Sequence, residues 1–269
     1  MEQVTYRIPR GKRIPSRKRV SLTRRVQRAI QQTRRRIRAI LPNGELQSLV
    51  LYGSYVYGKP RPDSDVDLML IYDDVTPEQE QALKDLVIDL YDVRPRPHLF
   101  LYRADDVAKN LGRSSLLYNV AHHGILLEGA PMPEHEINRS VVSGELLVKA
   151  KDALRQAQLL LDGEGYDGAI SRSFYAVLHA AEAALATQGL VAKSHDGVEM
   201  LFGKHFFKTG LVDEKFKGLF HRIHQARIKA DYERGVQFTR EEAAYWFARA
   251  QEFVAAMETG VPQWLADSA

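Results

Sequence analysis

Hydrophobic periodicity changes once along this chain, and that change limits the fold more than any single motif. Between residues 46 and 123, apolar strand-like runs alternate with helical segments, whereas every segment after residue 136 has helical spacing. We predict strands over residues 46–52, 66–72 and 97–102, and helices over residues 77–91, 104–111 and 114–123. Five more helices are expected over residues 140–162, 166–188, 196–207, 213–234 and 240–260. The fold class is therefore an α/β domain followed by an all-α helical bundle.

Residues 128–134 are expected to be rich in turns, and the predicted boundary between the two domains lies in residues 129–138, which contain Pro131 and Pro133. A chain of 269 residues is long enough for two domains, each with a core of its own. Four parts are expected: a flexible arm, a basic amphipathic helix, the α/β domain and the helical domain, over residues 1–20, 21–42, 43–132 and 138–262.

The net charge of +4 combines a basic N-terminal segment with an acidic remainder. Residues 1–40 hold fourteen Lys and Arg and one acid, so they carry +13, and the rest of the chain carries −9. Within this segment Ser21 is a plausible N-cap, and five apolar residues at helical spacing form one stripe: Leu22, Val26, Ile30, Ile37 and Leu41. The arginine face is expected either to contact RNA or DNA or to dock on the acidic body of the protein.

Composition excludes several classes of protein and site. The chain has no cysteine, which excludes a disulfide framework, a thiolate nucleophile and a cysteine-based metal site. It contains no apolar run of about 18 residues and no apolar signal-peptide core. We therefore expect a cytoplasmic protein that does not span a membrane.

The densest chemical signal follows the first predicted strand. Gly53 and Ser54 come directly after that strand, and a glycine there lets the backbone approach a phosphate closely. Gly58 is expected to complete the turn, and Ser64 is a further nucleotide-binding candidate. Asp65 and Asp67 stand two residues apart at the next strand, so both carboxylates are expected on one face. Carboxylates placed side by side repel each other, and this favours a bridging Mg²⁺ or Mn²⁺ ion.

This motif, GSYVYGKPRPDSDVDLML, resembles the core of the polymerase-β-like nucleotidyltransferases, particularly the minimal nucleotidyltransferase branch. The resemblance implies that Asp65 and Asp67 are catalytic metal ligands and that Gly53 and Ser54 bind the triphosphate of ATP or another NTP. It also implies a third carboxylate from a later strand, but residues 96–102 contain no acid. His98 is expected at that position, with Asp92 as the nearest upstream carboxylate and a tentative catalytic residue.

The helical half resembles the HEPN family in three segments: residues 165–176, 193–197 and 227–232. HEPN domains commonly accompany minimal nucleotidyltransferases and often dimerise, so a homodimer is expected. Many are metal-independent ribonucleases with an Arg-to-His motif, whereas here Arg227 is followed by Asp231 and Tyr232. Arg227 and Asp231 are tentative catalytic residues, and Tyr232 is a candidate acceptor for an adenylyl group.

Together these features predict a magnesium-dependent nucleotidyltransferase. It would move a nucleoside monophosphate, AMP from ATP in the first instance, to a protein tyrosine, an RNA end or a small molecule. The resemblance also implies a role in toxin–antitoxin or phage-defence systems. Two alternatives remain open at this point: a non-catalytic nucleotide-sensing protein that binds RNA or DNA, and a HEPN-type ribonuclease.

Overall fold

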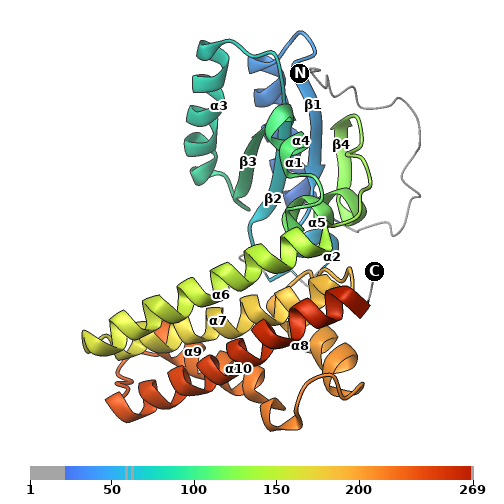
Figure 1. The fold of residues 1–269 in the computed structure, drawn as a ribbon. Coiled ribbons are helices and arrows are strands. Elements are labelled where there is room, and N and C mark those ends of the chain that lie inside the picture. Colours follow the sequence, from blue (N-terminus) through green and yellow to red (C-terminus); the bar gives the residue numbers. More distant parts are fainter. Residues whose placement is uncertain (1–21, 58–59, 62–63, 268–269) are drawn as a thin grey trace. The chain divides into compact units, whose positions relative to one another are not determined.

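The computed structural model describes residues 22–57, 60–61 and 64–267, which divide into two compact units, one ending at His135 and the other beginning at Glu136. The first is a mixed sheet with helices and the second is helical, so the predicted fold class is confirmed (Figure 1). The arm expected over residues 1–20, together with Ser21 and Gly58, lies outside the described residues. Among the described residues, no helix has the length and apolar character that a membrane span requires.

The sheet of the first unit has four strands in the order β3-β2-β1-β4. β1 (Leu46–Leu51) pairs antiparallel with β2 (Val66–Tyr72), and β2 pairs in parallel with β3 (Pro97–Arg103). The crossover between the parallel strands consists of α3 (Pro77–Asp89) and the short 3₁₀ helix η1 (Leu90–Asp92). The single helix predicted over residues 77–91 is therefore two elements.

The strand β4 (Ile125–Gly129) was not predicted, because residues 128–134 were expected to form turns. β4 pairs antiparallel with β1, and it follows α5 (Ser115–His123) after one residue, Gly124. A Cβ atom at Gly124 would lie 2.4 Å from a methyl carbon of Val50, so only glycine allows this close approach. The strand forms through that tertiary contact, which a run of five residues does not reveal.

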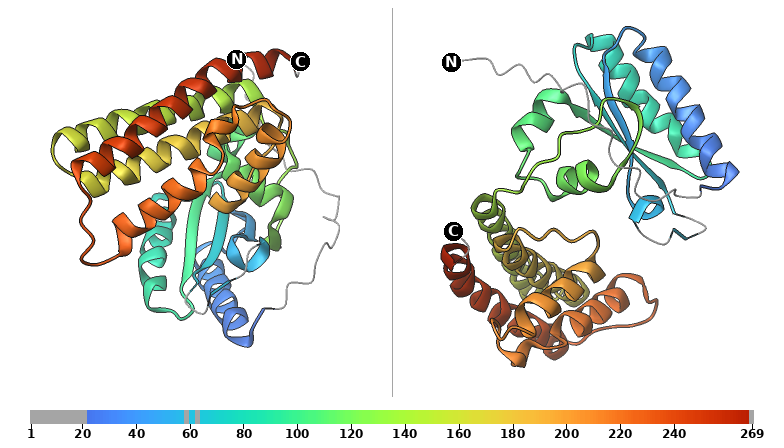
Figure 2. Two further views of the ribbon diagram at one scale, coloured as in Figure 1. Left: turned by 90° about the horizontal axis from the view of Figure 1, so that it is seen from below. Right: turned by 90° about the vertical axis from the view of Figure 1, so that its right-hand side faces the viewer.

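Helices cover both faces of the sheet, as the right-hand view of Figure 2 shows. The helix α1 (Arg24–Ile40) and α3 pack on one face, where Ile37, Leu68 and Leu83 are fully buried. The other face carries α4 (Ala104–Asn110) and α5, with Met69 and Leu117 in its core. Along β2, odd and even residues thus face different helical layers.

The stripe predicted for α1 is confirmed as its contact with the sheet, since Val26, Ile30, Ile37 and Leu41 are buried. Its N-cap, however, is Thr23, whose hydroxyl accepts a hydrogen bond from the Val26 N–H at 3.4 Å. The expectation that Ser21 caps the helix is therefore wrong. The helix begins at Arg24, two residues later than a cap at Ser21 would place it.

Part of the arginine face of α1 is used within the unit. Arg34 and Arg38 both contact Glu128 on β4, at 3.1 and 2.5 Å, and Arg36 pairs with Asp89 at the end of α3. These contacts match the expected docking of the basic helix on an acidic body. Within the described residues, no ion pair is recorded for four other arginines of this helix: Arg24, Arg25, Arg28 and Arg35.

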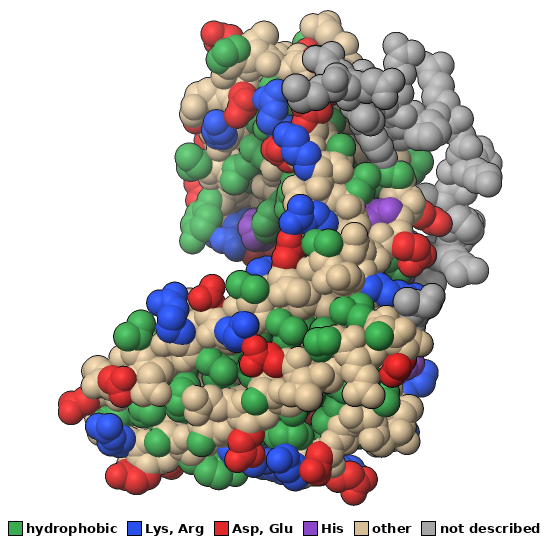
Figure 3. Space-filling view, viewed as in Figure 1, with side chains coloured by type: hydrophobic (Ala, Val, Ile, Leu, Met, Phe, Trp, Pro, Cys, Tyr) green, Lys and Arg blue, Asp and Glu red, His purple; other side chains and the backbone are tan. Residues whose placement is uncertain are grey.

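The second unit is built around α7 (Tyr166–Thr187), which packs against α6 (Arg139–Asp162), α9 (Leu219–Tyr232) and α10 (Arg240–Asp267). Its buried face is rich in alanine, and these small side chains let the neighbouring helices approach closely. The core around it includes Phe174, Phe206, Ile223 and Met257. On the face seen in Figure 3, hydrophobic side chains of this unit are interspersed with charged ones.

Three predicted helix boundaries in this unit need correction. The segment 196–207 is α8 (His195–Phe202) followed by the π-helix η2 (Gly203–Phe207), and 213–234 is η3 (Glu214–Phe216) followed by α9. α10 continues through Gly260 and Pro262, where a stop was expected. Trp264 packs over Gly260 so closely that a Cβ there would lie 2.4 Å from its ring, and this packing holds the extra turns of the helix.

Candidate functional site

Asp67 lies within β2 on the sheet face opposite α1, because it alternates with Val66 and Leu68, which are buried under α1 and α3. The parallel register places it directly beside His98 of β3, and Asp67 Oδ1 lies 3.6 Å from His98 Nδ1. His98, which was expected at the position of the third carboxylate, therefore lies next to Asp67. Its ring also packs against Phe100, with the ring centres 4.3 Å apart.

Gly53 joins β1 to the short helix α2 (Ser54–Tyr57) and lies against Asp67. Its φ is +73°, and a Cβ atom there would stand 2.0 Å from Asp67 Oδ2, so no other residue fits. The backbone N–H of Ser54 favours the ionised Asp67 carboxylate and so acts to lower its pKa. The Gly53-Ser54 turn and the second aspartate of the motif thus form one compact cluster.

Burial shapes the electrostatics of this cluster. It raises the pKa of Asp67, and the neighbouring Asp65 raises it further, whereas His98 and the Ser54 N–H act in the opposite direction. Burial also raises the pKa of the Tyr52 phenol at the end of β1, with Asp67 as a second cause. A carboxylate with a raised pKa is stabilised by a nearby cation, which is what a metal site requires.

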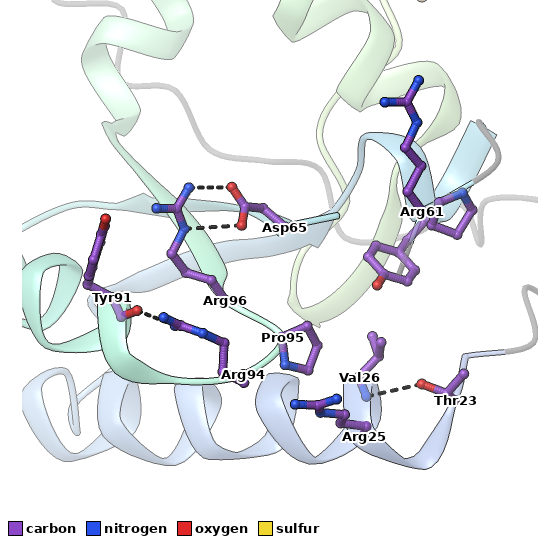
Figure 4. Close-up of a pocket in the computed structure, with 11 residues that line it drawn as sticks. Thr23, Arg25, Val26, Arg61, Asp65, Tyr91, Arg94, Pro95 and Arg96 are labelled. Carbon is purple, nitrogen blue, oxygen red and sulfur yellow. Dashed lines mark hydrogen bonds and ion pairs between the residues drawn. The ribbon is translucent and has the colours of Figure 1, made fainter. Parts of the chain in front are cut away.

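Asp65 stands one residue before β2 and has a different partner. Arg96 binds it through two contacts, with Nε 3.1 Å from Oδ1 and Nη2 closer still to Oδ2. Figure 4 shows this pair at one wall of a cavity. The sequence reasoning did not identify Arg96 as a site residue. Only the register between β2 and β3 reveals its role, since the pairing of Val66 with Pro97 sets Arg96 opposite Asp65.

Two further predicted site residues of this unit, Ser64 and Asp92, lie before β2 and at the end of η1. The Ser64 hydroxyl accepts a hydrogen bond from the Arg61 N–H at 2.8 Å and closes the turn before β2. Asp92 ends η1 with an exposed side chain, and it is not among the residues that line the cavity beside Asp65. Among the described residues, no group of three acidic or histidine side chains could hold a metal ion. A bound ion would therefore take its remaining ligands from phosphate oxygens and water.

The second predicted cluster lies on α9 of the helical unit. Arg227 Nε is 2.7 Å from Asp231 Oδ2, and its Nη2 donates to the Tyr175 hydroxyl at 3.3 Å. The Nε contact is an ion pair without the alignment of a hydrogen bond. The Tyr232 ring lies 5.3 Å from the guanidinium carbon, and its side chain is 71% exposed. The structure thus brings together Arg227, Asp231 and Tyr232.

Histidines approach the same cluster from two elements. The His224 ring stacks on Phe174 at 4.9 Å, and His195, at the start of α8, lies 6.2 Å from the His224 ring. His179, which follows Arg172 at the spacing of an Arg-to-His motif, instead contacts Glu182 at 3.0 Å. Arg172 lies over the Tyr175 ring, 4.8 Å from its centre. No histidine follows Arg227 on its own helix.

Comparison with known families matches each unit separately. The family model of the nucleotidyltransferase domain matches residues 30–111, and that of the HEPN domain matches residues 143–259. A UPF0332 protein of Thermotoga maritima is 33% identical over 110 residues, which are 41% of this chain and 83% of that protein. A Methanocaldococcus jannaschii protein named a "putative toxin" is 34% identical over 109 residues, 40% of this chain and 81% of its own length.

Among solved structures, the fold is similar to that of the spectinomycin adenyltransferase AAD(9) from Enterococcus faecialis, whose structure was determined with ATP and spectinomycin. The TM-score is 0.52 and the sequence identity 11%, with 86% of this chain and 99% of the other covered. At that identity the likeness concerns the fold alone.

Proposed function

Because the chain belongs to the HEPN domain family and joins a nucleotidyltransferase domain to its HEPN domain, we propose that it transfers a nucleoside monophosphate to a hydroxyl group. ATP is the proposed donor, so the group transferred is AMP and the product released is pyrophosphate. Asp65, Asp67, His98 and the Gly53-Ser54 turn form the proposed catalytic site. Asp92 is retained only as an alternative to His98.

The observation that carries this proposal is the contact between Gly53 and Asp67. There is no room for a Cβ atom at Gly53, so the backbone after this glycine runs close to the Asp67 carboxylate. Backbone N–H groups bind phosphate oxygens, and a carboxylate binds the cation that accompanies them. The turn and Asp67 together therefore suit a metal-bound triphosphate better than they suit a structural role. Ser64 and Gly58 are proposed to complete the phosphate contacts.

The side chains present fit a magnesium or manganese ion in part. Asp65 and Asp67 offer the oxygen ligands that such ions prefer, and Mg²⁺ in nucleotide sites is commonly held by one or two carboxylates with phosphates and water. Two protein ligands are therefore sufficient once Arg96 gives up its contact with Asp65. The ion, when bound, would lower the pKa of the acceptor hydroxyl and neutralise charge on the phosphates.

In the proposed reaction the acceptor oxygen forms a bond to the α-phosphorus of ATP. The bond from that phosphorus to the oxygen bridging to the β-phosphate breaks, and pyrophosphate leaves with the electron pair. The proton of the acceptor hydroxyl passes to the imidazole of His98, which lies beside Asp67. Asp67 in turn stabilises the imidazolium that forms.

A protein tyrosine, an RNA end and a small molecule are all acceptors of this kind. Tyr232 is the proposed protein acceptor, since its ring is exposed and its neighbour Arg227 could hold the incoming phosphate. A HEPN nuclease is not proposed, because Asp231 pairs with Arg227 and is poorly placed as a general base. The name of the M. jannaschii relative supports a toxin–antitoxin role, and a homodimer is the proposed assembly.

Purified protein incubated with α-labelled ATP and Mg²⁺ tests this function. Wild type is expected to release pyrophosphate and to label protein, RNA or an aminoglycoside, whereas an Asp65→Ala/Asp67→Ala variant does neither. An Asp105→Ala/Asp106→Ala variant, which changes two exposed aspartates of α4, serves as the matched control. If wild type releases no pyrophosphate with any of these acceptors but still binds ATP, the protein is a nucleotide sensor.

A further inference from the structure

A cavity of about 680 Å³ opens beside Asp65 in the nucleotidyltransferase unit. Four segments line it: the start of α1, Tyr55 of α2, the turn before β2, and η1 with its link to β3. Figure 4 shows guanidinium groups from three of these segments around the cavity. Its charged lining consists of one carboxylate, Asp65, and four arginines: Arg25, Arg61, Arg94 and Arg96.

Among the described residues, the arginines of this cavity have few carboxylate partners. Arg96 pairs with Asp65, and Arg94 donates to the backbone oxygens of Tyr91 and Val93 at 2.5 and 3.0 Å. Within the described parts of the chain, no ion pair is recorded for Arg25, Arg61 or Arg94. Guanidinium groups held near one another without carboxylate partners attract an anion, and phosphate suits them best because it binds bidentately.

The cavity adjoins the proposed triphosphate site. Thr23, Arg25 and Val26 of α1 form part of its wall, whereas Asp67 and the Gly53-Ser54 turn do not line it. Four residues of the motif line the cavity, namely Tyr55, Pro60, Arg61 and Asp65, and Asp65 is the one carboxylate among them. The proposed triphosphate site and this arginine-lined cavity would thus meet at Asp65.

Aromatic side chains and further arginines indicate the length of the ligand. Tyr55 and Tyr91 line the cavity, and Tyr91 is 62% exposed, with the Arg96 guanidinium 5.1 Å from its ring centre. Along α1, a shallow basic hollow is lined by Arg24, Arg28, Arg35 and Arg36 with three glutamines. A mononucleotide needs no such extension, whereas a basic surface combined with aromatic rings is typical of sites that bind single strands.

We infer that this cavity binds the phosphodiester backbone of a single-stranded nucleic acid and presents the strand's terminal hydroxyl to the carboxylates as the acceptor. The inference rests on the proposed function, whose acceptor class it names. The strand's terminal oxygen then forms the new bond to the α-phosphorus, pyrophosphate leaves, and the hydroxyl proton passes to His98. Arg25 and Arg94 hold phosphates of the strand.

Binding of a 12-nucleotide fluorescent strand to the full-length protein, followed by anisotropy without ATP, tests the cavity separately from catalysis. RNA and DNA strands of one sequence are compared. An Arg25→Gln/Arg94→Gln variant is expected to bind at least tenfold more weakly. The slope of log K against log salt should fall by about one for each phosphate that the variant no longer binds. The charge-matched control is Arg155→Gln/Arg240→Gln in the helical unit, which should bind like wild type.

Three results would overturn the inference. The first is equal strand affinity in the Arg25→Gln/Arg94→Gln variant and wild type, and the second is an equal loss of affinity in the control. The third is displacement of the strand by pyrophosphate together with a matching loss of ATP affinity in the variant, because the cavity would then hold the donor. Circular dichroism of both variants establishes that they fold. If strand binding depends on Arg25 and Arg94 but no nucleotide is transferred, the proposed function fails while the binding site stands.

Discussion

The imidazole of His98 and the carboxylate of Asp67 face each other across the parallel strands β2 and β3, with Nδ1 and Oδ1 3.6 Å apart. Loss of a positioned general base commonly lowers a rate by about 10² to 10⁴. We therefore expect His98→Gln to lower kcat for AMP transfer by that factor and to change the KM for ATP little. Steady-state pyrophosphate release measures both constants. An Asp92→Asn variant is the control, and a larger loss there than in His98→Gln would assign the base to Asp92.

Asp67 is expected to lower the stability of the metal-free protein at neutral pH. Burial raises its pKa above the ordinary value of 3.8, so the folded state binds the proton more tightly than the unfolded state. Stability from this group is therefore full at low pH and is lost as the pH rises through the raised pKa. Asp67→Asn removes the charge and should raise Tm at pH 7 by a few degrees, roughly the effect of 1 kcal/mol, while transfer is abolished.

The measurement is thermal unfolding from pH 4 to pH 8 in the presence of a chelator. The difference in Tm between Asp67→Asn and wild type should grow with pH. A difference that is constant, or that shrinks toward pH 8, would show that the pKa of Asp67 is not raised. Asp105→Asn, an exposed carboxylate of α4, is expected to change Tm little at any of these pH values.

Arg96 and a divalent cation compete for Asp65. Both partners of this ion pair are about one-third exposed, and such pairs contribute about 0.2 to 1 kcal/mol. Removing the guanidinium with Arg96→Ala should therefore tighten Mn²⁺ binding by a factor of about 1.4 to 5, as measured by electron paramagnetic resonance without nucleotide. Arg94→Ala, which leaves the pair intact, should not change it. Weaker Mn²⁺ binding in Arg96→Ala would mean that Asp65 is not a ligand.

Local patterns in the sequence were sufficient for much of the fold. The strand over residues 66–72 was predicted with its observed bounds, because seven mostly apolar residues between turn residues suit a buried strand. The buried apolar stripe of α1 was likewise predicted from its helical spacing. β4 was missed because it exists only through its pairing with β1 and the close approach at Gly124. Tertiary packing likewise carries α10 past Pro262.

The sequence likewise indicated some residues of the candidate site and missed others. Position relative to two strands singled out Gly53, which follows β1, and Asp65 and Asp67 at the start of β2. The pairing of Asp65 with Arg96 depends on how β3 aligns with β2, and local composition does not specify that register. The cavity could not be predicted either, since its arginines come from three separate segments that only the tertiary fold brings together.

The apolar stripe of α1 makes this helix part of the nucleotidyltransferase unit. Ile37 is fully buried against the sheet, whereas Arg35 is exposed on the other side of the helix. Ile37→Ala is expected to lower the free energy of unfolding by about 2 to 5 kcal/mol, and Arg35→Ala by no more than about 0.5 kcal/mol. Urea unfolding followed by circular dichroism measures both. A loss below about 1 kcal/mol for Ile37→Ala would show that the helix is dispensable for the fold.

Tyr232 is the position at which we expect the protein to label itself when no strand is supplied. Its side chain is 71% exposed at the end of α9, and the neighbouring Arg227 guanidinium lies 5.3 Å from the ring centre. Tyr232→Phe removes the hydroxyl and preserves the ring packing, so AMP incorporation should fall at least tenfold with no loss of folding. Tyr245→Phe changes another exposed tyrosine of the same unit and should leave incorporation unchanged. Peptide mass spectrometry locates the added group, and incorporation that persists in Tyr232→Phe would mean that this hydroxyl is not the acceptor.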